Sequence, residues 1–185
     1  MQKIWEQITH PNNLTLYRVI AVPVFVILLM YPNSKVCTFL AALIFSAAAI
    51  TDLFDGFLAR KRGLVSNLGK HIDPLADKFL VSSAFIMLAS YNRAPAWIVC
   101  IIIGRELAIT GLRSIIADKG EDVSASILGK YKTGFQIAAI IPLLLHFSYF
   151  GIDFHFIGSF LLWCALFFTM WSGIDYYVRF KKFIG

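Results

Sequence analysis

The stretch TDLFDGFLARKRGLVSNLGKHIDPLADK, residues 51–78, holds four aspartates at the edge of otherwise apolar sequence. Asp52 and Asp55 are three residues apart, and Asp73 and Asp77 are four residues apart. On a helix, each of these spacings places both carboxylates on one face. The pattern therefore predicts two helices, joined by a short loop, that present two carboxylate pairs to each other.

Four carboxylates at the depth of a membrane need compensation. One carboxylate at the bilayer centre costs about 2.5–3.5 kcal/mol, so four would cost on the order of 10 kcal/mol. Two divalent cations would cancel the four charges and then bind a phosphate-bearing substrate. We therefore expect Asp52, Asp55, Asp73 and Asp77 to bind two metal ions. Oxygen ligands favour Mg²⁺, with Mn²⁺ as a substitute.

The composition is that of a membrane protein. Of the 185 residues 58% are hydrophobic, and long apolar runs are separated by short charged loops. This pattern is typical of a polytopic helical membrane protein and argues against a soluble domain. The net charge is +6, but the positions of the basic residues along the chain are more informative than their sum. No nucleic-acid partner is expected. At this length we expect one membrane domain covering residues 1–185.

Six apolar runs predict an all-α integral membrane fold with six transmembrane helices, since each run exceeds the roughly 18 residues needed to cross. The expected spans are about Leu14–Tyr31, Val36–Ala59, Leu68–Tyr91, Pro95–Ala117, Lys130–Phe150 and Phe154–Phe180. Before them, Met1–His10 mixes apolar and polar residues without a cleavable signal pattern. This segment predicts a short interfacial helix, and a frayed terminus is the alternative.

Lysine and arginine gather on one side of the predicted bundle. They are Arg60, Lys61, Arg62 and Lys70 between spans two and three, Arg113, Lys119, Lys130 and Lys132 between spans four and five, and Arg179, Lys181 and Lys182 in the tail. The opposite loops hold only Lys35 and Arg93. The asymmetry predicts a multi-pass protein of the cytoplasmic (inner) membrane, with both termini and the aspartate loop facing the cytoplasm.

Small and basic residues accompany the aspartates. Gly56, Ala59 and Arg60 share a helical face with the first aspartate pair, and Gly69 lies one turn before Asp73. The small residues leave room for a bulky group near the backbone. An arginine beside metal-binding acids suits a phosphate or an anionic leaving group.

The start of the first span carries a second polar face. Asn12, Thr15 and Arg18 are spaced by three residues and share one side of a helix. An arginine just inside an apolar run favours a functional role. Asn12 could equally be a plain helix cap.

A second basic cluster lies on spans four and five. Its members are Arg105, Thr110, Arg113, Lys130 and Lys132. Two lysines near the start of a helix, with its free amides, make a natural phosphate cradle. The cluster therefore indicates an acceptor that itself carries a phosphate. Two simpler explanations stay open: a buried ion pair of Arg105 with Glu106, and anchoring of the two lysines at the cytoplasmic membrane surface.

The pattern DLFDGFLAR, followed by eight residues to Gly69, three to Asp73 and three to Asp77, resembles the CDP-alcohol phosphotransferases. The resemblance implies a six-helix membrane fold, usually a homodimer, that transfers a phosphatidyl group from a CDP-linked donor to an alcohol and releases CMP. By position it implies that Asp52, Asp55 and Asp73 are metal ligands and that Asp77 is both a metal ligand and the general base. It also implies a CDP site lined by Gly56, Ala59, Arg60 and Gly69, with Asn12 and Thr15 nearby.

Within that family, IGRELAITGLR (residues 103–113) followed by LGKYKT (residues 128–133) is similar to members that transfer the phosphatidyl group of CDP-diacylglycerol to sn-glycerol 3-phosphate. The resemblance thus implies phosphatidylglycerol phosphate as the product of a phospholipid biosynthetic enzyme. Serine, inositol phosphate or a phosphatidyl lipid are alternative acceptors. A divalent-cation transporter is a distant alternative, because it leaves Arg60 and the basic cluster unexplained. His71 and Asp175 receive no role.

Overall fold

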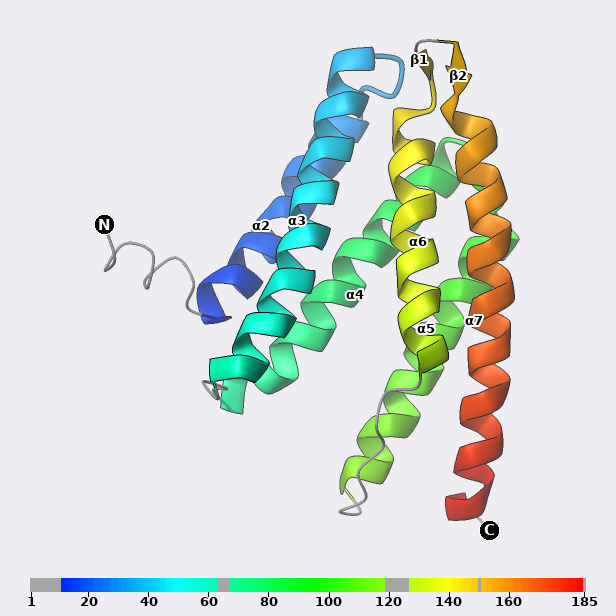
Figure 1. Ribbon diagram of the computed structural model, residues 1–185. Helices are drawn as coiled ribbons and strands as arrows, with labels where there is room; N and C mark the ends of the chain where they lie inside the picture. Colours follow the sequence, from blue (N-terminus) through cyan, green and yellow to red (C-terminus); the bar gives the residue numbers. More distant parts are fainter. Residues whose placement is uncertain (1–10, 63–66, 119–126, 150, 185) are drawn as a thin grey trace. The chain divides into compact units, whose positions relative to one another are not determined.

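The computed structural model describes residues 11–62, 67–118, 127–149 and 151–184, with side chains at 20–51, 78–116, 128–148, 151–178 and 181. Within these ranges the chain is mostly helical, as predicted (Figure 1). The elements are α2 Pro11–Leu29, α3 Lys35–Arg62, α4 Asn67–Ser90, α5 Ala96–Asp118, α6 Ile127–Leu145, β1 Ser148–Tyr149, β2 Ile152–Asp153 and α7 Phe154–Ile184. The interfacial helix expected over Met1–His10 lies outside the described residues.

The chain divides into two compact units, residues 1–87 and residues 88–185. In the first unit, α2 and α3 run side by side in opposite directions (Figure 1). Ser34 begins α3, because its hydroxyl accepts a hydrogen bond from the Cys37 amide at 3.3 Å, as a helix cap does. Phe25 and Phe45 are fully buried, and their rings meet edge to face at 6.5 Å. Side chains from the first two apolar runs of the sequence therefore form the contact between these two helices.

In the second unit, α6 and α7 pack along each other, and α5 also packs against α7 (Figure 1). Gly158 on α7 sets the closest approach to α6. A Cβ atom at Gly158 would lie 2.6 Å from Leu143 Cγ and 2.9 Å from the Leu143 backbone nitrogen. Small residues at helix interfaces allow this close packing of two backbones.

The junction between α6 and α7 differs from the prediction. The fifth span was predicted to reach Phe150, but α6 ends at Leu145. An antiparallel hairpin of two strands follows, each two residues long, in which Tyr149 pairs with Ile152. His146 adopts a left-handed φ of 55°, which stops the helix. Asp153 then begins α7, because its Oδ1 accepts hydrogen bonds from the amides of His155 and Phe156 at 2.9 and 3.2 Å.

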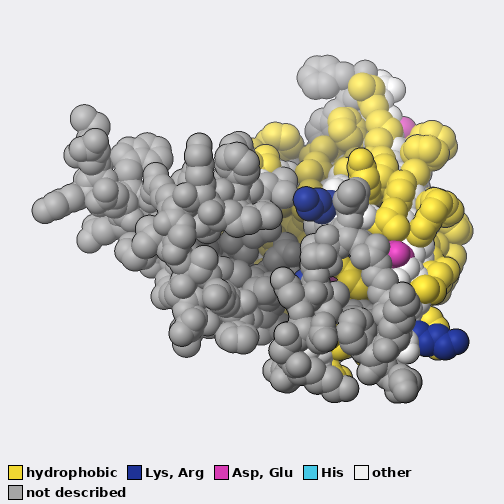
Figure 2. Space-filling model, turned by 60° about the horizontal axis from the view of Figure 1, so that its bottom comes forward, with side chains coloured by type: hydrophobic (Ala, Val, Ile, Leu, Met, Phe, Trp, Pro, Cys, Tyr) yellow, Lys and Arg dark blue, Asp and Glu magenta, His cyan; other side chains and the backbone are white. Residues whose placement is uncertain are grey.

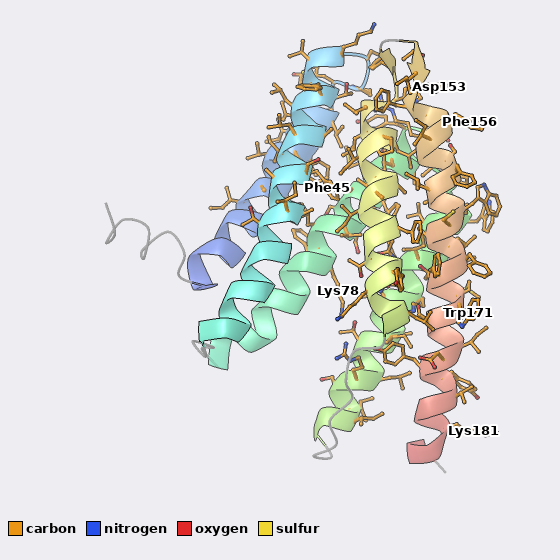
Figure 3. The ribbon with its side chains drawn as sticks, viewed as in Figure 1. Phe45, Lys78, Asp153, Phe156, Trp171 and Lys181 are labelled. Atoms are coloured by element: carbon orange, nitrogen blue, oxygen red, sulfur yellow. The ribbon has the colours of Figure 1, made fainter. Side chains whose placement is uncertain are left out.

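The surface of α7 is apolar over much of its length. Among the described residues, Phe154–Val178 is the segment long and apolar enough to cross a membrane, and only 28% of its most apolar window is buried. Phe156 and Trp171, labelled in Figure 3, are exposed. Hydrophobic side chains also dominate the described part of the face in Figure 2. Three shorter apolar stretches lie in other helices, at Ile20–Leu29, Lys35–Thr51 and Lys78–Ser90. One apolar span candidate is thus present, and the count of six spans stays a prediction.

Candidate active site

The four aspartates of the opening motif lie on two helices, as predicted. Asp52 and Asp55 belong to α3, and Asp73 and Asp77 belong to α4. Helical backbone at these positions places each pair on one face. Their side chains lie outside the described residues. The side chains that the structure does describe include no group of three or more His, Cys, Asp or Glu that could hold a metal ion.

The residues predicted to line a nucleotide site also fall on helices. They are Asn12 and Thr15 in α2, Gly56, Ala59 and Arg60 in α3, and Gly69 in α4. Because α3 is continuous from Lys35 to Arg62, its three members share a face with the first aspartate pair. The positions of these six side chains lie outside the described part of the chain.

The basic cluster of the second unit is described in atomic detail. Glu106 on α5 forms ion pairs with two cations through the same oxygen, Oε1. Arg105 Nη1 donates to it at 3.2 Å, and Lys132 Nζ from α6 donates to it as well. The side chains of Arg105, Glu106 and Lys132 are only 10%, 14% and 7% exposed. The buried ion pair considered from the sequence is therefore present, and it includes Lys132 as well as Arg105.

Arg105 is fixed further by α7. Its Nη2 donates to Ser172 Oγ at 2.9 Å, and that hydroxyl donates to the Thr169 carbonyl at 3.1 Å. The guanidinium carbon lies 5.6 Å from the centre of the Tyr176 ring. Arg105 Nε is buried without a hydrogen-bond partner among the described residues. The missing side chain of Gly173 leaves space beside it, since a Cβ there would lie 3.6 Å from Nε.

The other three members of the predicted phosphate site have different surroundings. Thr110 donates from its hydroxyl to the Glu106 carbonyl at 2.7 Å, within α5. Arg113 and Lys130 are exposed. The structure therefore brings Arg105 and Lys132 together on one carboxylate and leaves Lys130 at the surface.

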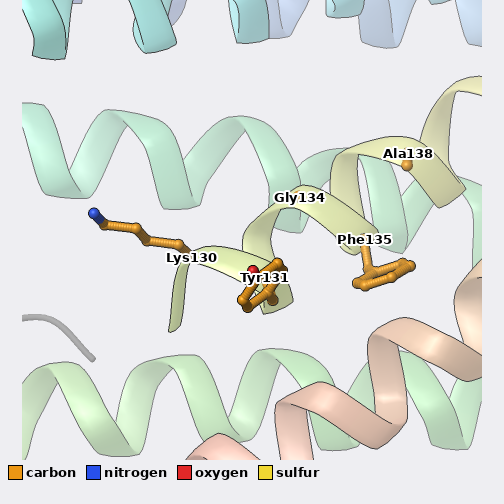
Figure 4. A pocket seen from close by; sticks show the side chains of 5 residues that line it. All are labelled: Lys130, Tyr131, Gly134, Phe135 and Ala138. Carbon is orange, nitrogen blue, oxygen red and sulfur yellow. The ribbon is translucent and has the colours of Figure 1, made fainter. Parts of the chain in front are cut away.

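A pocket of about 360 Å³ lies along α6, lined by Lys130, Tyr131, Gly134, Phe135 and Ala138 (Figure 4). Phe135 stacks on Phe168 of α7 with ring centres 4.8 Å apart, and Tyr131 stacks on the same ring at 6.1 Å. The Lys130 side chain extends away from both aromatic rings (Figure 4). All five lining residues belong to α6, and the sequence alone did not predict this pocket.

Polar groups also gather near the hairpin, where the sequence suggested no site. His146 Nδ1 lies 3.3 Å from His155 Nδ1. Burial holds the pKa of His146 below its ordinary value, the charges of Arg93 and His155 lower it further, and Asp153 opposes them. Arg93 itself is buried and donates to the Leu144 carbonyl at 3.1 Å. Burial lowers the Arg93 pKa from its ordinary value.

Comparison with known proteins gives a family match over most of the chain. The family model described as CDP-alcohol phosphatidyltransferase matches residues 8–171. A Bacillus subtilis (strain 168) protein named CDP-diacylglycerol–glycerol-3-phosphate 3-phosphatidyltransferase is 44% identical over 180 residues, covering 91% of this chain and 93% of that protein. A Rickettsia bellii protein of the same name is 40% identical over 174 residues, covering 94% and 96%. A probable phosphatidylglycerophosphate synthase of Mycobacterium tuberculosis is 38% identical over 176 residues, covering 94% and 82%.

Proposed function

The chain belongs to the CDP-alcohol phosphatidyltransferase family, and from this premise we propose that it transfers the phosphatidyl group of CDP-diacylglycerol to sn-glycerol 3-phosphate. The resemblance predicted from the aspartate motif is thereby confirmed, and the chain is an enzyme of this class. The proposed products are phosphatidylglycerol phosphate and CMP. The choice of acceptor is supported by similarity to two proteins whose names state this reaction, over 91% and 94% of this chain.

The proposed reaction is a displacement at phosphorus. A hydroxyl oxygen of the acceptor attacks the phosphorus that bears diacylglycerol, and the bond from that phosphorus to CMP breaks. CMP leaves with the bonding electron pair. We propose that Asp77 takes the acceptor's proton as general base, which is the role that the resemblance to the CDP-alcohol phosphotransferases implies for this position. General-base catalysis of this kind is typically worth about 10²–10⁴-fold.

The aspartates Asp52, Asp55, Asp73 and Asp77 are proposed to hold two Mg²⁺ ions, for which Mn²⁺ can substitute. Their donor set fits, because all the ligand atoms are carboxylate oxygens, which hard divalent cations prefer. The helical backbone supports the fit by keeping each pair on one face of α3 or α4. When bound, such ions stabilise negative charge on the phosphates of the donor.

The nucleotide is proposed to bind beside these aspartates. Gly56 and Ala59 share their helical face and leave room for the base and ribose, while Arg60 on the same face provides a cation for the phosphates. Gly69 supplies space one turn before Asp73. The remaining two contacts are proposed on α2, at Asn12 and Thr15.

The phosphate of the acceptor is proposed to bind at the basic cluster of the second unit. The assigned residues are Arg105, Thr110, Arg113, Lys130 and Lys132. Arg105 and Lys132 lie close together on Glu106, and two neighbouring cations suit an anionic phosphate. Lys130 and Arg113 add exposed cations at which a soluble phosphate ester can first bind.

The protein is proposed to span the cytoplasmic (inner) membrane six times as a homodimer, with the site facing the cytoplasm and a short interfacial helix at the N-terminus. The six described helices contain 19 to 31 residues. At about 1.5 Å per residue they are roughly 28–46 Å long, against a hydrocarbon core about 30 Å thick. The distribution of lysine and arginine supports the orientation.

The test of the proposed function is an acceptor assay. Purified protein in detergent, supplied with CDP-diacylglycerol and Mg²⁺, is given glycerol 3-phosphate, serine or inositol phosphate in separate reactions. Of the three acceptors, we expect only glycerol 3-phosphate to give CMP release and phosphatidylglycerol phosphate as the product. Turnover with serine or inositol phosphate, and none with glycerol 3-phosphate, would overturn the proposed acceptor.

The role of Asp77 is tested in the same assay with Asp77→Asn. Loss of the base should lower kcat by at least about 10²-fold, while binding of CDP-diacylglycerol is largely retained. Asp153→Asn is the matched control, because Asp153 lies in the hairpin and asparagine caps a helix about as well as aspartate. Activity of the Asp77→Asn protein equal to that of the control would remove the base assignment.

A further inference from the structure

Glu106 holds two cations that come from different helices. Its Oε1 accepts from Arg105 Nη1 on α5 at 3.2 Å and from Lys132 Nζ on α6. These three side chains are only 7–14% exposed. Two buried cations without a carboxylate between them would repel each other and lose hydration. Glu106 is therefore what allows both cations to stay charged and close together in this interior.

One donor of the cluster is unused. Arg105 Nε is buried and has no hydrogen-bond partner among the described residues. A buried donor without a partner costs about 1–3 kcal/mol. The space at Gly173 lies beside this nitrogen. The unused donor belongs to a cation and has space beside it, and together these favour an anionic oxygen as the missing partner.

The guanidinium of Arg105 is also held in one orientation. Nη1 donates to Glu106, Nη2 donates to Ser172 at 2.9 Å, and the guanidinium carbon lies 5.6 Å from the centre of the Tyr176 ring. An arginine whose rotamer is fixed loses little entropy when an anion binds. The contacts that fix it come from α5 and α7, while Lys132 comes from α6. Glu106 thus links the cations of two helices into one rigid group.

We propose that Glu106 is the positioning residue of the acceptor site: it orders Arg105 and Lys132 so that together they bind the phosphate of the acceptor alcohol. This inference rests on the proposed function, because it requires an acceptor that carries a phosphate. Glu106 itself does not touch the substrate and acts through the two cations. It therefore affects binding of the acceptor, while binding of the CDP-linked donor depends on other residues.

The first experiment compares Glu106→Gln with Glu106→Asp in the purified full-length protein. Glutamine keeps the shape and removes the charge, so the KM for glycerol 3-phosphate should rise about tenfold or more. The KM for CDP-diacylglycerol and kcat should stay within about twofold of the wild type. Aspartate keeps the charge and should recover part of the loss. Two outcomes for Glu106→Gln would overturn the proposal. One is an unchanged KM for glycerol 3-phosphate, and the other is a similar change in the KM for both substrates and in kcat.

A second measurement does not depend on turnover. Inorganic phosphate should raise the Tm of the wild-type protein, and Glu106→Gln should require about tenfold more phosphate for the same rise. This readout keeps the inference separate from the proposed function. Wild-type protein that uses another acceptor overturns the proposed function, whereas equal protection of wild type and Glu106→Gln by phosphate overturns the role of Glu106.

A double-mutant cycle covers the case in which Glu106→Gln folds poorly. Glu106→Gln combined with Lys132→Met removes the ion pair from both sides, which buried sites tolerate better than the loss of one partner. If Glu106 acts partly through Lys132, Lys132→Met should raise the acceptor KM less in the Glu106→Gln protein than in the wild type. Strictly additive effects on the acceptor KM would contradict positioning through Lys132.

Discussion

The beginning and the end of α6 both contain a buried cation, but they stabilise it in different ways. At the beginning, Lys132 pairs with the Glu106 carboxylate, which also holds Arg105. At the end, Arg93 donates to the carbonyl of Leu144 in the last turn of the helix. That carbonyl is one of the four that a helix leaves without an internal partner, and it lies at the negative end of the helix dipole.

This difference separates a binding group from a structural one. The two cations that share the Glu106 carboxylate are proposed to bind a ligand, whereas the cation on the helix terminus completes the fold around it. The two lysines at the beginning of α6 sharpen the point, because Lys132 is buried and Lys130 is exposed. Changes at the beginning of α6 should therefore affect acceptor binding, and changes at its end should affect stability.

The largest effect is expected from Lys132→Met. It removes one of the two cations from Glu106, so the acceptor KM should rise more than about tenfold and the free energy of unfolding should fall by about 1–3 kcal/mol. Lys130→Met is the matched control, with a stability change within about 0.5 kcal/mol because the side chain is exposed. Kinetics and thermal unfolding in detergent measure both. Equal losses of stability in the two variants would break the distinction between these lysines.

Gly158→Ala tests the end of α6 by disturbing its packing against α7 without changing any charge. The added methyl group would meet the backbone nitrogen of Leu143 at 2.9 Å, and backbone cannot move aside as a side chain can. Overpacking of this kind costs about 1–3 kcal/mol. Gly111→Ala is the control, because a Cβ there meets nothing within 4 Å and alanine favours a helix. We expect a lower Tm for Gly158→Ala, with an unchanged acceptor KM in the folded fraction, and an equal or higher Tm for Gly111→Ala.

Arg93→Met should cost about 1–2 kcal/mol, since it removes a charged hydrogen bond to the end of α6 and leaves the Leu144 carbonyl without that donor. Arg93→Lys keeps the charge and should recover part of the loss. Thermal unfolding measures the stability of both variants. An acceptor KM that rises in Arg93→Met as it does in Lys132→Met would show that the two ends of α6 are not functionally distinct.

The sequence predicted the helices well because their ends carry local signals. Pro32 and Asn33 separate α2 from α3, and Pro95 directly precedes α5. The predicted end of α6 was wrong by five residues, because residues 146–150, HFSYF, continue the apolar run of the helix. The left-handed His146 and the pairing of Tyr149 with Ile152 end the helix there, and neither is visible in hydrophobicity.

The candidate site was predictable where its residues are neighbours in sequence. Arg105 and Glu106 are adjacent in sequence, so the sequence alone indicates that they can form an ion pair. Lys132 is 26 residues from Glu106, and Ser172 is 67 residues from Arg105, so these partners required the packing of α5, α6 and α7. The aspartate motif predicted two helices, and both are confirmed. The metal and nucleotide roles of these residues stay predictions.

The smallest effect concerns pH at the end of α6. The folded protein holds the pKa of His146 below its ordinary value of 6.5, mainly through burial and then through Arg93 and His155, with Asp153 opposing. Acid therefore protonates His146 in the unfolded chain first. The stability contributed by neutral His146 should be complete above about pH 6.5 and should decrease as the pH falls below it.

His146→Asn tests this contribution, because asparagine tolerates the left-handed φ of 55° and does not titrate. The Tm of the wild type should fall more between pH 7.5 and 5.5 than that of His146→Asn. His155→Gln is the control: burial and Arg93 act on His146 more strongly than His155 does, so most of the pH dependence should remain. Parallel pH profiles in the wild type and His146→Asn would place the acid sensitivity of this protein outside the end of α6.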